Sequence, residues 1–335
     1  MSELRSDPVT GRWVVVAGSR LARPNEYVAP SAPTAVEDCP FCEGHEGRTP
    51  PEIEAVRPAG TGADRPGWSV RTIPNKFPTV ARDASPTPNP DGFGMFTVRP
   101  GSGVHEVIIQ NPRHAPGLPF LRPEHRRSIF ETFRNRVRAL GLEPTVRSVL
   151  LFENSGPESG GTLYHPHSQA VALPLLPPAL EEETSGADRW RKSHDGACVW
   201  EAMGTTERTL RTRLVWEDDA LVALAPWASH YPFETMVMAH RHSPSFSEVS
   251  DVELDRLADV IPGLLRALLK VEPGASYNYF LHSAPAPGGN AGFHWHFHLA
   301  PRLVRPDGFE LGSGISVNPV APEAAAEAIR SALDL

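Results

Sequence analysis

The chain has 335 residues, which suggests roughly two domains, and its 40% hydrophobic content is typical of a globular protein. We find no apolar run long enough to span a membrane and no apolar signal core near Met1, so we expect a cytoplasmic protein without a membrane partner. The formal net charge of −8 argues against nucleic acid as a partner, and three cysteines are too few for a disulfide framework.

Hydrophobic patterns predict the same series of elements in each half of the chain, ending in a histidine-bearing strand. In chain order, the predicted strands are Val104–Gln110, Ser148–Glu153, Ser168–Leu173, Leu221–Leu224, Thr235–Ala239 and Tyr277–His282. A helix is predicted over 124–140, a second begins at the capping-box residue Ser250, and the Ala-rich tail over 322–335 predicts a third. Hairpins with one helix in each half predict an α+β fold with an antiparallel sheet.

The two halves resemble each other at a nearly constant offset. The matched pairs, 128 or 129 residues apart, are His114 and His242, Phe152 and Phe280, and His165 and His294. Several matches in order indicate an ancient duplication. We therefore predict two homologous domains, 1–178 and 197–335, joined by a Pro- and Glu-rich linker from Pro177 to Gly196. The halves would then pack together as a pseudo-dimer.

The sharpest chemical signal is the His-Pro-His-Ser-Gln run from His165 to Gln169. Pro166 suits the start of a strand, which would present His167 at the mouth of that strand. A neutral imidazole is a good nucleophile toward phosphorus and a good leaving group afterwards, and Gln169, on the same side, can donate to a phosphate oxygen. The Gly- and Ser-rich loop over 154–161 offers backbone N–H groups to the same phosphate. The alternative is a pair of histidines without chemistry.

Two further groups of residues have metal-ligand character. Cys39 and Cys42 form a CxxC knuckle that needs two more ligands for tetrahedral zinc, and His114 and His165 are the natural candidates. The alternative is a pair of ordinary buried thiols. Cys198 is expected to be a small core residue without a partner.

The second group contains His282, His294, His296 and His298, and a carboxylate from Glu181, Glu182 or Glu183 would complete a metal site. Alternatively, the second half has lost catalysis and keeps its histidines for packing. Near the N-terminus, Arg20 and Arg23 have the geometry for phosphate recognition, although a solvated face explains them equally well.

These residues together resemble a known family. The motifs that carry the resemblance are Leu4–Trp13, Cys39–Cys42, Pro74–Pro78, His105–Ile109, Phe152–Asn154, His165–His167, Tyr231–Thr235 and His294–His298. Over nearly its whole length the chain is similar to the galactose-1-phosphate uridylyltransferase family, the two-repeat branch of the histidine-triad superfamily. The resemblance implies two tandem histidine-triad-like domains.

The resemblance also implies a ping-pong nucleotidyl transfer, as in UDP-glucose–hexose-1-phosphate uridylyltransferase. His167 would attack the α-phosphorus of a nucleoside-diphosphate sugar, a sugar 1-phosphate would leave, and a second sugar 1-phosphate would take the nucleotide. Gln169 would assist as the second catalytic residue. The implied substrate-binding residues are Arg20, Arg23, Asn75, Asn154, Gly161 and Thr162.

The family pattern further implies metal ions and a dimer. It assigns zinc to Cys39, Cys42, His114 and His165. A second metal, iron or zinc, would bind His282, His296, His298 and a glutamate, for which we choose Glu183 from the three adjacent candidates. Family resemblance also implies a homodimer.

Two departures from the galactose enzymes keep the substrate open. Ser168 stands where they have glycine, and Ser313-Gly314 replaces a Tyr-Glu pair that reads sugar hydroxyls. The second change is closer to bacterial relatives and to plant ADP-glucose phosphorylase, so an adenylyl transferase using phosphate, or another sugar nucleotidylyltransferase, is the alternative. A histidine-triad hydrolase is more remote, because Gln169 occupies the place of its third histidine. A nucleotide-binding protein without turnover fits least well with the intact catalytic motif.

Overall fold

The computed structural model describes residues 2–7, 9–10, 13–17, 36–82, 101–286 and 291–334. The predicted phosphate-binding residues Arg20 and Arg23 lie outside the described residues. Within the described part, ten strands form one sheet in which every neighbouring pair is antiparallel. In spatial order they are β3 (Glu54–Val56), β4 (Val70–Pro74), β5 (Val104–Ile109), β7 (His167–Leu173), β6 (Ser148–Ser155), β11 (Tyr277–His282), β12 (His296–Pro301), β10 (Thr235–Ala239), β9 (Leu221–Leu224) and β8 (Leu214–Glu217).

The strand order shows the predicted duplication directly. Outward from the central pair β6 and β11, the sheet continues as β7, β5, β4 and β3 on one side and as β12, β10, β9 and β8 on the other. Each half therefore has the same strand connectivity, and β6 pairs with β11 from Leu151 opposite Leu281 to Ser155 opposite Tyr277. The predicted α+β fold with an antiparallel sheet is confirmed, and the two repeats share one continuous sheet.

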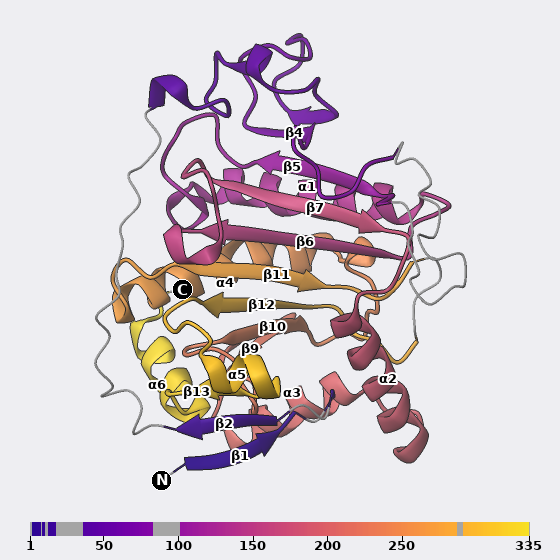
Figure 1. Ribbon diagram of the computed structural model, residues 1–335, viewed down its shortest axis with the longest axis vertical. Coiled ribbons are helices and arrows are strands. Elements are labelled where there is room, and N and C mark those ends of the chain that lie inside the picture. The colour runs from indigo at the N-terminus through magenta and orange to yellow at the C-terminus, as the bar shows by residue number, and fades with distance from the viewer. Residues whose placement is uncertain are drawn as a thin grey trace.

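Helices α1 (Pro123–Gly141) and α4 (Asp251–Val271) pack side by side on one face of the sheet, behind the strands in Figure 1. The helix α6 (Pro322–Ala332) packs beside α4. The predicted capping box is present at the start of α4, because Ser250 accepts from the Glu253 N–H and Glu253 accepts from the Ser250 N–H. Among the described residues, no helix is long and apolar enough to cross a membrane.

Strands of the second half are buried on both faces, and their side chains alternate between two cores. Leu221 and Ala223 of β9 join the large core under α1 and α4. Val222 and Leu224 join a second core with residues of α2 (Pro178–Ser193) and α3 (Val199–Leu210). The helices α2 and α3 cover the second half on the face away from α4, and His167 and Gln169 lie on the corresponding face of the first half.

The segment from Pro177 to Gly196, predicted to link the two domains, is mostly helical in the structure. Most of it forms α2, which begins with Pro178 at its first position and packs Leu180 and Ala187 into the second core. The glutamate-rich composition concealed an amphipathic helix with a narrow apolar side. The helix α3 was not predicted at all.

A small sheet lies apart from the large one, at the bottom of the view in Figure 1. Strand β1 (Ser2–Ser6) pairs antiparallel with β2 (Trp13–Ala17), and β13 (Ser316–Asn318) adds parallel to β2. Between them, Val9 lies against Gly186 of α2, where a Cβ atom would stand 1.5 Å from the Val9 carbonyl oxygen. The N-terminal segment therefore depends on glycine at position 186. The remaining short helix, α5 (Gly308–Ser313), precedes β13.

Candidate functional site

His167 lies at the start of β7, on the face away from α1 and next to Phe41 of the CxxC segment. Its Nδ1 is 2.7 Å from the His165 carbonyl oxygen, which only accepts, so Nδ1 carries the proton and donates it. The lone pair of the neutral ring is therefore on Nε2. Burial lowers the pKa of His167, opposed in part by the hydrogen bond to His165, so the neutral ring is favoured. The sequence pattern alone did not specify this tautomer.

Gln169 lies two residues further along β7 on the same face. Its Oε1 is 2.8 Å from Nε2 of His105 in β5 and 3.5 Å from Nδ2 of Asn75, which directly follows β4. Asn75, which was predicted to contact the nucleotide, therefore lies next to the carboxamide of Gln169. The sequence places His105 in one of the family motifs, but no local pattern indicates that it contacts Gln169.

The predicted phosphate loop connects β6 to β7. Gly156 and Gly160 both have positive φ, and a Cβ at Gly156 would lie 2.4 Å from Oγ of Ser276, so this turn requires glycine there. Asn154 begins the loop and accepts from Nδ2 of Asn278 on β11 at 2.7 Å. Gly161 and Thr162 end the loop, six and five residues before His167. The loop and the histidine are therefore joined at the same end of the sheet.

Cys39, Cys42, His114 and His165 form one cluster, with all four ligand atoms within 4.8 Å of one another. The Cys39 Sγ is 3.4 Å from Nδ1 of His165, and the Cys42 Sγ is 3.7 Å from Nδ1 of His114. The other ring nitrogen of His165 donates to the Asn111 carbonyl at 2.7 Å, which turns Nδ1 toward the thiols. This donor set fits a tetrahedral metal ion such as zinc.

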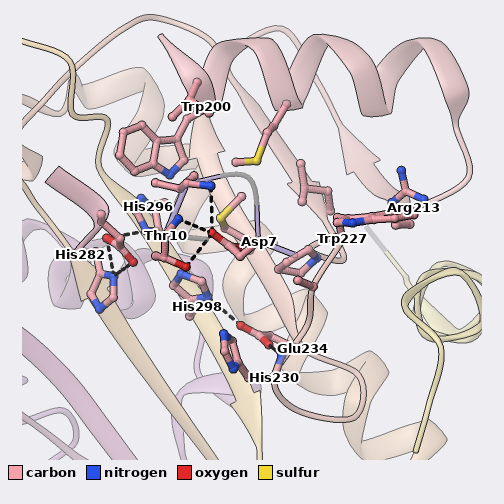
Figure 2. Close-up of a pocket in the computed structure, with 18 of the residues that line it drawn as sticks. Asp7, Thr10, Trp200, Arg213, Trp227, His230, Glu234, His282, His296 and His298 are labelled. Atoms are coloured by element: carbon pink, nitrogen blue, oxygen red, sulfur yellow. Dashed lines mark hydrogen bonds and ion pairs between the residues drawn. The ribbon is translucent and has the colours of Figure 1, made fainter. Parts of the chain in front are cut away.

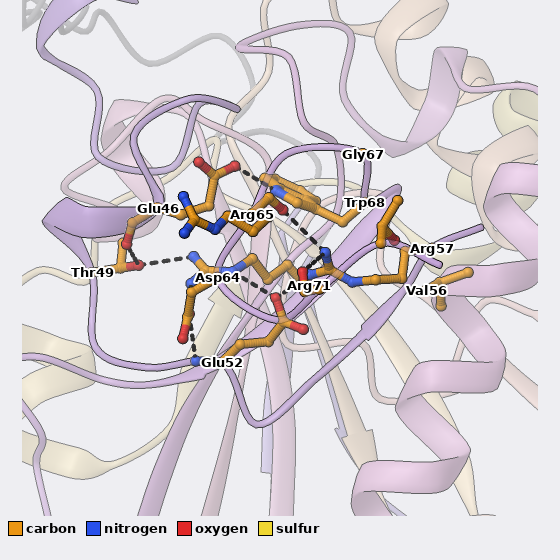
Figure 3. Close-up of polar contacts among 12 residues, drawn as sticks. Glu46, Thr49, Glu52, Val56, Arg57, Asp64, Arg65, Gly67, Trp68 and Arg71 are labelled. Carbon is orange, nitrogen blue, oxygen red and sulfur yellow. Dashed lines mark hydrogen bonds and ion pairs between the residues drawn. The ribbon is translucent and has the colours of Figure 1, made fainter. Parts of the chain in front are cut away.

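A buried arginine fixes the segment that follows the two cysteines (Figure 3). The Arg71 guanidinium on β4 is 1% exposed and donates to Asp64 Oδ1 at 2.7 Å, to Thr49 Oγ1 at 2.8 Å and to Glu52 Oε2 at 3.2 Å. Nearby, the Trp68 indole donates to Glu46 Oε1 at 2.8 Å. The irregular chain between Cys42 and β4 is thus held by polar contacts to one side chain.

The second cluster contains Glu183, His282, His296 and His298, again with ligand atoms within 4.8 Å. Of the three adjacent glutamates, Glu183 is the one in this cluster, and its Oε1 is 2.8 Å from Nδ1 of His282. His296 donates from Nδ1 to the His294 carbonyl at 2.8 Å, and His298 bonds Glu234 through Nδ1 at 2.9 Å. Both hydrogen bonds leave Nε2 for a metal ion, so the group fits a divalent cation.

A cavity of about 690 Å³ lies against this second cluster rather than against His167 (Figure 2). Its walls include Trp200, Trp227, Arg213, Glu234 and the three histidines of the second cluster. His296 and His298 follow His167 and Gln169 by the repeat offset of 129 residues. The cavity therefore occupies, in the second repeat, the place that the His167 face occupies in the first.

Cys198 lies in the second core, as predicted, but it has polar neighbours that the sequence did not indicate. Its thiol lies with His242 and His294, and the three possible ligand atoms are within 4.8 Å of one another. His242 and His294 are the repeat counterparts of His114 and His165. His294 was expected to lie with His296 and His298, but it precedes β12, which begins at His296, so strand geometry does not keep it on their face and its ring lies near Cys198 instead.

On the helix side of the sheet, directly behind His167, a buried polar group surrounds Glu153 of β6. Ser168 donates to its Oε2 at 3.3 Å and lies 2.7 Å from the Tyr279 hydroxyl, while Gln110 donates to the same carboxylate. Burial raises the pKa of Glu153 to about 7, although these three donors partly lower it. The serine at position 168 thus has a structural partner.

We expect stability to depend on pH through Glu153. Unfolded glutamate titrates near pH 4.5, so between that pH and about 7 the unfolded chain has lost a proton that the folded protein keeps. The contribution of Glu153 therefore lowers the free energy of unfolding as the pH rises through this window, by on the order of 3 kcal/mol. Urea unfolding at pH 5 and at pH 8 measures this change. Between these two pH values, the free energy of unfolding should fall less in Glu153→Gln than in the wild type. An equal fall in both proteins would contradict a raised pKa for Glu153.

Comparison with known proteins extends over the whole chain. Residues 1–177 match the profile described as galactose-1-phosphate uridyl transferase, N-terminal domain, and residues 183–328 match its C-terminal domain. Among curated relatives, ADP-glucose phosphorylase from Arabidopsis thaliana is 29% identical, over 98% of this chain and 92% of its own. Galactose-1-phosphate uridylyltransferase from Thermotoga maritima is 27% identical, over 98% of both chains.

Solved structures give the same result. The crystal structure of the Arabidopsis thaliana ADP-glucose phosphorylase with bound ADP-glucose aligns with a TM-score of 0.82 at 29% identity, covering 98% of each chain. A structure described as uridylyltransferase aligns with a TM-score of 0.77 at 28% identity, covering 99% of this chain and 98% of that one. Sequence and fold agree along both repeats, and the chain belongs to the galactose-1-phosphate uridyl transferase family.

Proposed function

We propose that this protein is a ping-pong nucleotidyltransferase, a UDP-glucose–hexose-1-phosphate uridylyltransferase that forms a nucleotidyl intermediate on His167. The observation that carries the proposal is the fixed tautomer of His167, whose proton on Nδ1 donates to the His165 carbonyl at 2.7 Å. The lone pair on Nε2, on the face of β7 away from α1, is what attack on phosphorus requires. The uridylyltransferases among its curated relatives support the same reaction class.

Each half-reaction moves one bond at phosphorus. Nε2 of His167 attacks the α-phosphorus, the bond from that phosphorus to the bridging oxygen breaks, and sugar 1-phosphate leaves with the electron pair. The hydrogen bond from Nδ1 to the His165 carbonyl stabilises the positive charge that the ring gains. A phosphate oxygen of the acceptor then attacks the same phosphorus, the P–N bond breaks, and neutral His167 is restored.

A second candidate is an ADP-glucose phosphorylase, which transfers an adenylyl group to phosphate. Two observations favour it: Ser313-Gly314 replaces the hydroxyl-reading pair of the galactose enzymes, and the Arabidopsis thaliana enzyme aligns along 98% of this chain. Both candidates use His167 in the same way. They differ in nucleobase and acceptor.

Intact mass spectrometry separates the two candidates. The purified protein is incubated with UDP-glucose or with ADP-glucose, each without acceptor. We expect a uridylyl adduct with UDP-glucose; an adenylyl adduct formed only with ADP-glucose would favour the phosphorylase. Absence of an adduct with either donor would contradict the proposal.

We propose zinc at Cys39, Cys42, His114 and His165, and iron or zinc at Glu183, His282, His296 and His298. The first ion would connect the CxxC segment to the residues before β7, since His165 precedes His167 by two positions. The second would connect α2 to β11 and β12. Neither ion is required to touch the transferred phosphate.

Metal content tests these assignments. We expect Cys42→Ser to lose about one equivalent of zinc per chain, because a three-ligand site holds the ion more weakly. Glu183→Gln is the matched control: it should lower metal at the second site and leave the first unchanged. Elemental analysis of both variants and the wild type gives the answer, and zinc retained in full by Cys42→Ser would contradict the first site.

We also propose nucleoside-diphosphate sugars and sugar 1-phosphates as substrates, a homodimeric state and a cytoplasmic location. Support comes from the family resemblance and from the three cysteines, all of which are free thiols. Analytical ultracentrifugation tests the dimer: a single species at the monomer mass would contradict it.

A further inference from the structure

The side-chain carboxamide of Gln169 can adopt two orientations that differ by half a turn. Its carboxamide has a donor end and an acceptor end of nearly the same shape, and only the Nε2–H₂ end can donate to a phosphate oxygen. Rotation by half a turn would present the carbonyl oxygen to the phosphate and repel it. Something in the protein must therefore fix the carboxamide before substrate binds.

A backbone N–H group fixes this orientation, because a backbone N–H can only donate a hydrogen bond. The N–H of Thr79 donates to Nδ1 of His105 at 3.0 Å, so Nδ1 is the acceptor and the proton of the neutral ring lies on Nε2. Nε2 of His105 faces Gln169 at 2.8 Å. A donor at this position requires the carbonyl oxygen of Gln169 opposite it, which leaves the Nε2–H₂ end of Gln169 for the substrate.

A second backbone N–H group fixes the orientation of the Asn75 side chain. The N–H of Phe77 donates to Oδ1 of Asn75 at 2.8 Å, so the amide group of Asn75 points toward His105 and Gln169. Its Nδ2 lies 3.1 Å from Nε2 of His105 and 3.5 Å from Oε1 of Gln169. Because Nε2 of His105 carries its own proton, Nδ2 can donate only to Oε1, and the two donors converge on that one oxygen. Two backbone N–H groups, at Thr79 and Phe77, thus set the orientation of one catalytic side chain.

Strand pairing explains why His105 reaches Gln169. His105 pairs with Val171 and Val107 pairs with Gln169, so His105 and Gln169 are diagonal neighbours on the same face. His105 is 8% exposed, and burial lowers its pKa, which favours the neutral ring. The contact is therefore shielded from water.

We propose that His105 is a positioning residue for nucleotidyl transfer, which holds the carboxamide of Gln169 so that its N–H₂ group faces the phosphate at His167. This inference rests on the proposed function. It assigns His105 no contact with the substrate, and its effect on transfer passes through Gln169.

A matched pair of variants separates the two contacts of His105. His105→Asn keeps an acceptor near the position of Nδ1 and loses the donor to Gln169, whereas His105→Gln keeps a donor near the position of Nε2 and loses the contact with Thr79. We measure the single-turnover labelling of His167 by UDP-glucose and by ADP-glucose. We expect His105→Asn to slow labelling about tenfold with little change in the donor concentration for half-maximal rate, and His105→Gln to stay within about threefold of the wild type.

A double-mutant cycle shows whether His105 acts through Gln169. In a Gln169→Ala background, His105→Asn should slow labelling no further. A full additional loss in that background would overturn the proposal, as would labelling by His105→Asn at the wild-type rate. His125→Asn is the control for a non-specific loss of packing. It removes a histidine of α1 whose Nε2 lies near the carbonyl oxygens of Ser69 and Gln110, and it should leave labelling unchanged.

The tautomer itself can be measured without turnover. In the enzyme labelled with ¹⁵N-histidine, with the signal assigned through His105→Asn, we expect the proton of His105 on Nε2. A proton on Nδ1 would overturn the proposal even if transfer is normal. If the wild type forms no adduct with either donor, the proposed function fails, while this spectrum still decides the orientation of Gln169.

Discussion

His167→Ala should abolish the nucleotidyl adduct while the protein remains folded. Removing the imidazole removes the Nε2 lone pair that attacks phosphorus. We expect a fall in labelling rate of at least about 10⁴-fold, a size typical for loss of a covalent nucleophile. Intact mass spectrometry after incubation with UDP-glucose or ADP-glucose measures it.

The control for this prediction is His194→Ala, which removes an exposed histidine stacked on Trp190. That variant should form the adduct at the wild-type rate, and circular dichroism should show both variants folded. An adduct of normal yield on His167→Ala would assign the nucleophile elsewhere and refute the mechanism proposed above.

Arg71→Met should produce a large loss of stability. The substitution keeps the apolar stem but leaves Asp64 and Glu52 without the guanidinium, and Glu52 retains only Arg57 as an ion-pair partner in the described residues. Breaking a buried ion pair from one side typically costs about 3–5 kcal/mol in the free energy of unfolding, and we expect the lower end because Asp64 is 44% exposed. Urea denaturation measures the change.

Arg305→Met is the matched control. Arg305 also pairs with a glutamate, Glu158, but its side chain is 67% exposed. An exposed pair contributes about 0–1 kcal/mol, so this variant should unfold close to the wild type. Since Arg71 holds the segment that follows Cys42, Arg71→Met should also retain less zinc than the control. Equal stability of the two variants would contradict the role assigned to Arg71.

Elements with strong periodicity were predicted closely. The strands at Leu221–Leu224, Thr235–Ala239 and Tyr277–His282 have the bounds predicted from the sequence. The helix expected over 124–140 is α1, one residue longer at each end. These elements are specified by their own residues, because burial on both faces of a sheet, or on one side of a helix, leaves a direct pattern in the sequence.

What the sequence did not reveal depends on partners far away in the chain. The helix α2 is polar on most of its surface and becomes stable by packing on the second core, so its composition resembled a linker. The contact of His105 with Gln169 joins residues 64 positions apart, and that of Cys198 with His294 joins two different elements. The tautomer of His167 also could not be predicted from the sequence, because it depends on which ring nitrogen faces the His165 carbonyl oxygen.

The pairing of β6 with β11 also governs what a fragment of this protein can do. Either strand, if its partner were removed, would offer a row of unpaired backbone donors and acceptors at an edge. A fragment ending near residue 178 would therefore self-associate through β6, with a second copy of the fragment supplying the missing half. The junction that joins the repeats in this chain is thus the same surface through which two separate copies of a single-repeat ancestor would have assembled.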